Sequence, residues 1–205
     1  MRQSMITLVL ATLLVGAVAA KARFTSTWKA PGAQGVSFAG KKVVGLIVHD
    51  DMNLRMSAEE ALARELANRG LQGVAAYRLI PKEEIRDPKL VKAWFERAGA
   101  AGVVMMRLID LSKEKIPSAV VWQSATYYNS LWSYYPYSWG AVYEIVPART
   151  EVKFIVETII FDVAAGHMVW AGTSESTNPK GVQTLVKDIV EAAGAEMKKD
   201  GLVGK

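Results

Sequence analysis

Three apolar runs between residues 42 and 109 decide the fold: KVVGLIVH (42–49), GVAAYRLI (73–80) and GVVMMRLI (102–109). A continuous apolar run of this length is typical of a strand that is covered on both faces. Segments with helical spacing of apolar residues separate the three runs. Because strands that alternate with helices pair in parallel through right-handed crossovers, the stretch predicts a β-α-β-α-β unit.

Start signals place the two helices between these strands. Ser57-Ala58-Glu59-Glu60 reads as a capping box, in which the Ser57 hydroxyl accepts a backbone N–H and Glu60 reaches back to the helix start. We therefore predict a helix over 57–69. The second helix begins at Asp87-Pro88, because proline is favoured at the first helical position, and it ends at Gly99 or Gly102.

The pattern changes after residue 110. Residues 118–125 and 151–162 have strand character, and residues 168–175 form the returning strand of a hairpin with 151–162. Lys153 and Glu157 interrupt the apolar run of 151–162 on one face. We therefore expect that face of the strand to be partly wet.

The remaining segments complete one domain. Asn178-Pro179 caps a final helix, which carries an apolar stripe up to Met197. We predict an α/β (α+β) fold with a single mixed sheet of five to six strands, in which antiparallel hairpins and a C-terminal helix follow the β-α-β-α-β start. Residues 41–205 form one domain, and the Gly-rich residues 23–40 form an extended segment before it.

The first 22 residues have the pattern of a signal peptide. Arg2 precedes an uncharged run from Met5 to Ala20 that ends in small residues. The run is shorter than the roughly 20 residues that span a bilayer, so cleavage is favoured over anchoring. Leu14-Val15-Gly16 would form a lipobox if a cysteine followed, but Ala17 stands there. The pattern predicts a periplasmic or secreted protein.

Composition excludes several classes of function. The chain has no cysteine, which excludes a disulfide framework, a thiolate metal site and a cysteine nucleophile. Two histidines do not suffice for a typical zinc site. The net charge of +5 comes from scattered basic residues, so nucleic-acid binding is a poor interpretation. We predict no metal and no cofactor.

Residues 126–144 form the most unusual segment. No charged residue occurs from Ile116 to Tyr143, and residues 127–143 read YYNSLWSYYPYSWGAVY. The separating Ser, Asn, Pro and Gly residues favour a loop. Eight of these 17 residues are aromatic: Tyr127, Tyr128, Trp132, Tyr134, Tyr135, Tyr137, Trp139 and Tyr143.

Two interpretations of this aromatic loop stay open. In the first, the rings pack on the protein's own sheet, because Tyr and Trp bury a large ring and keep a polar tip wet. In the second, the loop docks an envelope protein partner or a second copy of the chain, because Tyr and Trp are enriched at interfaces. A glycan or a membrane surface is a further possible partner for these rings.

A second candidate site lies at the strand ends. His49, Asp50 and Asp51 follow the first strand, and Asp110 follows the third. Ligands gather beyond the carboxyl ends of parallel strands, and a histidine with carboxylates suits acid–base work or a divalent cation. The alternative is that these residues solvate a turn and cap the next helix, which we favour because no nucleophile motif is nearby.

Several stretches together carry a family resemblance: FTSTWK (24–29) with Pro31, residues 42–48, the aromatic loop, VET (156–158), FD (161–162), GHMVWAGTSE (166–175) and Asn178-Pro179. In these stretches the chain resembles a group of bacterial envelope proteins of unknown function, many of them lipoproteins. More loosely, the order of elements resembles the α/β domains of outer-membrane accessory lipoproteins, such as activators of peptidoglycan synthases and the curli secretion lipoprotein. The resemblance implies a binding or assembly role and offers no catalytic residues.

Together these observations favour a non-enzymatic envelope protein that docks a partner through the aromatic loop. One alternative is a structural subunit of a homo- or hetero-oligomeric assembly, since strand edges and aromatic loops both drive association. The other is a small ligand-binding domain or enzyme that uses His49, Asp50, Asp51 and Asp110. It requires these four side chains to converge in one pocket.

Overall fold

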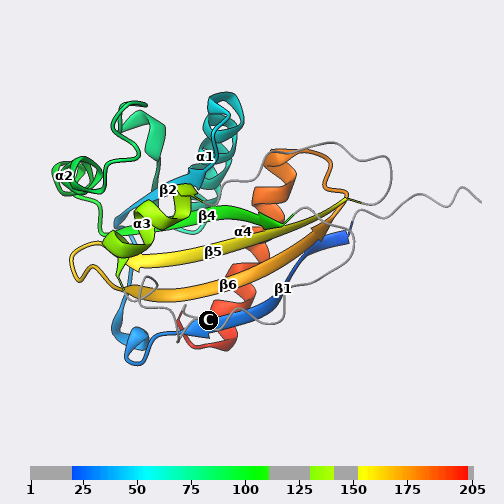
Figure 1. Ribbon diagram of the computed structural model, residues 1–205. Helices are drawn as coiled ribbons and strands as arrows, with labels where there is room; N and C mark the ends of the chain where they lie inside the picture. The colour runs from blue at the N-terminus through cyan, green and yellow to red at the C-terminus, as the bar shows by residue number, and fades with distance from the viewer. Residues whose placement is uncertain (1–19, 111–129, 141–151, 203–205) are drawn as a thin grey trace, which may run out of the picture.

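The structure is a computed structural model that describes residues 20–110, 130–140 and 152–202. The described residues form one sheet of six strands in the order β1-β6-β5-β4-β2-β3 (Figure 1). Parallel and antiparallel pairs occur in this sheet, which confirms the predicted mixed α/β fold. The strands are β1 (Ala20–Lys29), β2 (Lys42–Val48), β3 (Gln72–Ala75), β4 (Gly102–Asp110), β5 (Lys153–Asp162) and β6 (Met168–Thr177).

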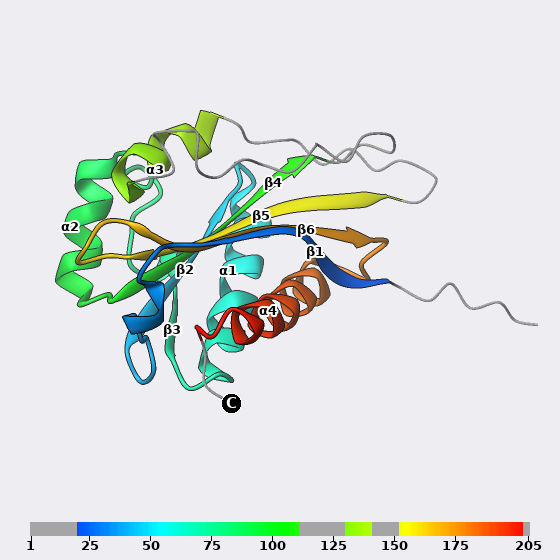
Figure 2. The same cartoon turned by 90° about the horizontal axis from the view of Figure 1, so that it is seen from below.

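The parallel part consists of β3, β2 and β4. Helix α1 (Met52–Ala67) connects β2 to β3, and helix α2 (Pro88–Ala98) connects β3 to β4. The first connection leads away from β2 and the second returns past it, so two crossovers of one hand place their helices on opposite faces. Figure 2 shows this arrangement, with α1 on one side of the sheet and α2 on the other.

The antiparallel part joins β4 to β5, β5 to β6 and β6 to β1. The predicted hairpin is therefore confirmed as β5 and β6. The extended segment predicted for 23–40 begins inside β1, which is an edge strand of the sheet. The Phe24 ring packs edge-on against Trp170, and the two ring centres lie 5.2 Å apart. Of the predicted signal peptide, residues 20–22 belong to β1 and residues 1–19 lie outside the described part, as does the predicted strand 118–125.

Two apolar cores lie on the two faces of the sheet. Helices α2 and α3 (Leu131–Gly140) cover one core, and helices α1 and α4 (Val182–Lys199) cover the other. Alternation along the strands separates the cores, because successive side chains point to opposite faces. In β2, for example, Val44, Leu46 and Val48 face the α2–α3 core, and Val43 and Ile47 face the α1–α4 core.

Two helices begin elsewhere than the sequence predicts. Helix α1 starts five residues before Ser57, because the Asp51 carboxylate accepts the backbone N–H groups of Asn53 and Leu54. The hydrogen bond from Leu54 lowers the pKa of Asp51. Helix α4 starts after Gly181 and not at Asn178. Asn178 has φ 48°, and its amide oxygen accepts the N–H of Val152 and therefore does not cap the helix. The predicted start of α2 at Asp87-Pro88 and its end at Gly99 are confirmed.

The strand predicted over 73–80 is short. It ends at Ala75, and residues Ala76–Arg78 form a 3-10 turn. The N–H of Tyr77 donates to the carboxylate of Glu59 at 2.6 Å and not to a neighbouring strand. A buried side chain of α1 therefore ends the pairing that apolar character alone would continue.

Replacing Asp51 by alanine tests where α1 begins. We expect the midpoint of thermal unfolding to fall by about 3 °C, because the first-turn N–H groups lose their acceptor. Asp51→Asn keeps an acceptor and should stay close to the wild type. Calorimetry of both variants beside Ser57→Ala checks the prediction, and a larger loss for Ser57→Ala than for Asp51→Ala would contradict it.

Candidate functional site

The aromatic segment is helical where the structure describes it. Leu131, Tyr134, Tyr135 and Ser138 are buried and recur at the spacing of one helix face, while Ser133, Pro136 and Tyr137 face outward. The loop predicted over 126–144 is therefore wrong for 131–140. Pro136 disfavours a helix locally, but it lies on the exposed side, and the buried aromatic face stabilises the helix through tertiary packing.

The structure divides the eight aromatic candidates. Tyr134 and Tyr135 are 1% and 0% exposed, so they are core residues and do not belong to a docking surface. Trp132 and Trp139 are half-buried, and Tyr137 is 40% exposed. The remaining candidates, Tyr127, Tyr128 and Tyr143, lie outside the described residues.

A buried ion pair lies beneath α3. Arg107 of β4 and Glu157 of β5 are opposite each other in register, and two guanidinium nitrogens lie 3.0 Å from the Glu157 carboxylate. The Tyr134 hydroxyl donates to the same carboxylate. The expected wet face at Glu157 is therefore wrong, because Glu157 is 1% exposed. Lys153 is half-buried and pairs instead with Glu175 at 3.4 Å.

The Arg107–Glu157 pair supports α3 and is closed to solvent. Burial opposes the charged guanidinium of Arg107, but Tyr134 and the Glu157 carboxylate outweigh burial and raise the pKa of Arg107. The guanidinium carbon also lies 5.1 Å from the centre of the Tyr137 ring. This contact is within the range of a cation–π interaction. The sequence carries a signal for this pair, because Arg107 is the charged residue of the apolar run 102–109 and Glu157 is that of the apolar run 154–161.

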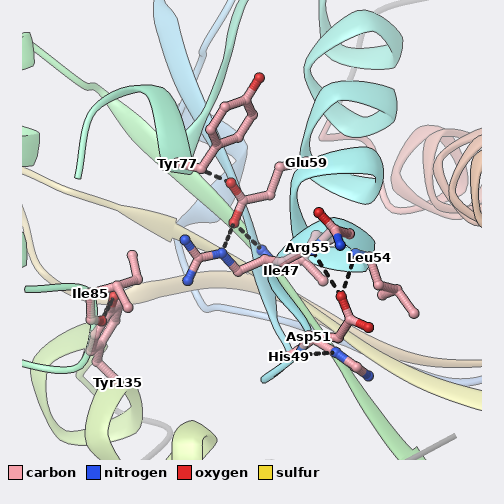
Figure 3. Close-up of polar contacts among 10 residues, drawn as sticks. Ile47, His49, Asp51, Leu54, Arg55, Glu59, Tyr77, Ile85 and Tyr135 are labelled. Atoms are coloured by element: carbon pink, nitrogen blue, oxygen red, sulfur yellow. Dashed lines mark hydrogen bonds and ion pairs between the residues drawn. The ribbon is translucent and has the colours of Figure 1, made fainter. Parts of the chain in front are cut away.

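A second buried cluster joins α1 to the parallel strands. The Glu59 carboxylate accepts the backbone N–H groups of Ile47 and Tyr77, and the Nε atom of Arg55 lies 3.6 Å from one of its oxygens (Figure 3). Burial raises the pKa of Glu59 to about 7, although the two N–H donors and Arg55 oppose the shift. Across the same region, the Tyr135 hydroxyl donates to the carbonyl of Ile85, which fixes the buried side of α3.

The strand-end candidates do not converge. The Nδ1 atom of His49 accepts the N–H of Asp51 at 3.0 Å, Asp51 caps α1, and Asp50 pairs with Arg86. A bulge in β4 places Asp110 opposite Ile155 of β5. Ile155 points to the same face of the sheet as Ile159, which belongs to the α2–α3 core. His49 follows the alternation of Ile47 and lines the opposite face.

The hypothesis of one pocket formed by His49, Asp50, Asp51 and Asp110 is therefore wrong. Asp110 lies on the α2–α3 face of the sheet, whereas His49 lines the cavity on the opposite face. Within residues 20–110, 130–140 and 152–202, no group of three or more His, Cys, Asp or Glu side chains could hold a metal ion.

Tyr137 is exposed on α3, and the half-buried Trp132 and Trp139 of the same helix lie beside cations. We name this surface the α3 patch and define it by Tyr137, Trp132 and Trp139 with the neighbouring Arg86 and Lys92. The Arg86 guanidinium carbon lies 5.4 Å from the centre of the Trp139 ring, and the Lys92 Nζ lies 5.7 Å from that of Trp132. Tyr, Trp and Arg are the residues that most often dominate binding energy at protein interfaces.

Comparisons with known proteins concern the fold. No family model and no curated protein matches the chain. It is similar to a PelC dodecamer from Paraburkholderia phytofirmans, with 14% identity, a TM-score of 0.46, and coverage of 82% of this chain and 91% of that chain. It is also similar to a lipoprotein from Neisseria meningitidis, with 13% identity, a TM-score of 0.40, and coverage of 78% and 99%.

None of the helices in the described part of the chain is both long and apolar enough to span a bilayer.

Proposed function

We propose that this chain is a non-catalytic binding or assembly module of the bacterial envelope, and that it docks a protein partner through the α3 patch. The observation that carries the proposal is the exposure of Tyr137 on a helix whose other face is buried. In the described residues, the exposed large hydrophobic side chains are Tyr137, at 40%, and Leu90 of neighbouring α2, at 42%.

The buried contacts of α3 hold this surface in place before a partner binds. Tyr134 donates to Glu157, Tyr135 donates to the Ile85 carbonyl, and Ser138 donates to the Tyr135 carbonyl at 2.7 Å. Association requires the ordering of interface side chains, which costs about 0.5–1.5 kcal/mol for each rotamer-rich side chain. A helix that is already fixed avoids part of this cost and favours specific docking.

The charge around the patch suits a protein surface better than nucleic acid. Arg86 and Lys92 lie over aromatic rings, but each also pairs with a carboxylate of this chain, Asp50 and Glu96 respectively. Their charge is thus partly neutralised, and the aromatic rings are left as the main contact. The proposed location outside the cytoplasm rests on the signal-peptide pattern of residues 1–22.

Photocrosslinking tests the proposed surface. A photoreactive phenylalanine at position 137 should capture a partner in native envelopes of the cells that make the chain. The same probe at position 90 is the matched control, because Leu90 has nearly the same exposure. With the captured partner in purified form, we expect Tyr137→Ser to weaken binding at least about tenfold, as for a central aromatic anchor, and Leu90→Ser to have a smaller effect.

Equal capture from both positions, or equal affinity of Tyr137→Ser and the wild type, would contradict the proposal. Both variants must first show an unchanged circular dichroism spectrum. A crosslinked product of twice the chain mass would identify the partner as a second copy of the chain.

A further inference from the structure

An apolar groove lies between α1 and α4, on the face of the sheet opposite α3. It holds two cavities, of about 210 and 640 Å³, which share Met106 of β4 as a wall. Leu54 and Ala58 line the smaller cavity, and Leu62 and Leu66 line the larger one. Because 12 residues of helix separate Leu54 from Leu66, the two cavities together line about 18 Å of α1.

His49 is the polar feature of the smaller cavity. Its Nδ1 accepts the N–H of Asp51, so the proton of the neutral ring is on Nε2. His49 is 9% exposed, and among the residues that the structure describes its buried Nε2 has no hydrogen-bond partner. In Figure 3 this nitrogen points away from Asp51 and from the cluster around Glu59. Leaving a buried donor unpaired is costly, so a ligand that places an oxygen acceptor at this nitrogen would gain a hydrogen bond there.

The surrounding wall is apolar. The side chains beside His49 include Ile47, Leu108, Val156, Val186 and Ile189. Arg107 also lines the cavity, but its guanidinium is held by Glu157 on the other face of the sheet. A site of this kind suits a ligand with an alkyl chain and an oxygen acceptor at one end.

The start of α4 adds a preference for negative charge. Pro179, Gly181 and Val182 line the same cavity, and the N-cap residue of this 18-residue helix is Gly181, which has no side chain to accept the first-turn N–H groups. The N-terminus of a helix carries partial positive charge and free N–H donors. With the His49 donor in the same cavity, these groups favour a carboxylate over an alcohol.

We propose that the groove between α1 and α4 binds one fatty acid, whose alkyl chain lies between the two helices and whose carboxylate accepts the Nε2–H of His49. The first-turn N–H groups of α4 supply donors for the second carboxylate oxygen. Gln183 of α4 donates to Ser57 of α1 at 2.6 Å and links the helices above the groove. This binding activity lies on the opposite face from the α3 patch and is independent of the proposed docking function.

Calorimetric titration of the full chain with decanoate, decanol and decyltrimethylammonium tests the proposal. We expect decanoate to bind more tightly than decanol, and the cationic probe to bind least. His49→Leu should weaken decanoate binding about tenfold, because it removes the donor and keeps an apolar side chain. Val182→Trp should block the cavity at its mouth and abolish binding.

Thermal unfolding of each variant controls for a loss of fold, and Tyr137→Ser should leave decanoate affinity unchanged. Co-sedimentation with phosphatidylglycerol vesicles distinguishes the source of the chain. Binding in solution alone supports a free fatty acid. Co-sedimentation that is lost in Val182→Trp would instead identify an esterified acyl chain, which has no free carboxylate, and would overturn the proposal. Equal affinity for the three probes, equal affinity of His49→Leu and the wild type, or no binding at millimolar decanoate would overturn the proposal.

Discussion

Replacement of Arg107 by methionine is expected to lower the free energy of unfolding by about 3–5 kcal/mol, because it leaves a buried carboxylate without its cation. Glu157 is 1% exposed and Arg107 is 5% exposed, so water cannot take the place of the lost guanidinium. The Tyr134 hydroxyl still donates to Glu157, but one neutral donor does not offset the charge. Urea unfolding at neutral pH gives the measurement.

Two further variants separate an unpaired charge from lost packing. The double variant Arg107→Met with Glu157→Leu removes both charges, and we expect it to recover most of the loss, since well-packed apolar pairs often replace buried ion pairs without cost. Lys153→Met is the matched control on the same sheet. It breaks an ion pair with Glu175 in which the lysine is 35% exposed, and its effect should stay below about 1 kcal/mol.

A loss for Arg107→Met no larger than that for Lys153→Met would contradict the assignment of Arg107 and Glu157 as the support of α3. Loosening of α3 should accompany the expected loss, because Tyr134 bonds to the same carboxylate. Hydrogen exchange of the amides of residues 131–140 would detect it. Removing all eight aromatic residues together is a poor test of docking, since Tyr134 and Tyr135 are core residues.

The sequence predicts best where local and long-range signals agree. The runs 42–49 and 102–109 are apolar over a full strand length, and both became strands of a doubly covered sheet. Asp87, Pro88 and Gly99 mark the ends of α2 through backbone chemistry that needs no tertiary contact. These features place the parallel half of the fold.

Prediction fails where a distant residue decides the outcome. In the sequence alone, Glu157 is typical of a solvent-facing residue in an apolar strand. In the fold, Arg107, which lies 50 residues earlier in the chain, pairs with it across the sheet. Ser57 with Glu60 matches a capping box, but the Asp51 carboxylate caps α1. The Glu60 carboxylate instead accepts hydrogen bonds from the Tyr77 hydroxyl and the Arg78 guanidinium. The buried residues of the aromatic segment have helical spacing at 131, 134, 135 and 138. Pro136 lies between them, and because proline disfavours a helix interior, the sequence predicts a loop there.

The candidate site shows the same division. Composition alone identifies residues 127–143 as unusual, and Tyr137 remains a docking candidate. Composition does not distinguish inner from outer rings, because that requires the register of α3 on the sheet. The position of His49 at the end of an apolar run makes it a site candidate in the sequence. Its partners differ from those expected, since strand alternation turns it toward α4 and away from Asp110.

The largest expected pH effect concerns Glu59. Burial raises its pKa from 4.5 to about 7 in the folded protein. A carboxyl whose pKa is raised by folding contributes stability that is fully present below the unfolded value of 4.5 and is lost as pH rises through 7. Because one pKa unit corresponds to about 1.4 kcal/mol, this loss amounts to about 3 kcal/mol.

Glu59→Gln removes the titrating group and should flatten the dependence of stability on pH between about 5 and 8. The variant has a cost of its own, since Glu59 accepts two backbone N–H groups with its two oxygens, and a glutamine presents an NH₂ group to one of them. The informative quantity is therefore the change in unfolding free energy between the two pH values, measured by urea unfolding for each protein.

Glu60→Gln is the matched control, because the neighbouring carboxyl should have the opposite pH dependence. The hydrogen bond from the Tyr77 hydroxyl lowers the pKa of Glu60, so its contribution is present at neutral pH and is lost as pH falls. Substitution of Glu60 should therefore leave the loss of stability between pH 5 and 8 in place. If the wild type and Glu59→Gln lose equal stability over this range, Glu59 is ionised throughout. In that case the two backbone N–H donors and Arg55 outweigh burial, and the cluster that joins α1 to β2 is a paired ionic site between pH 5 and 8.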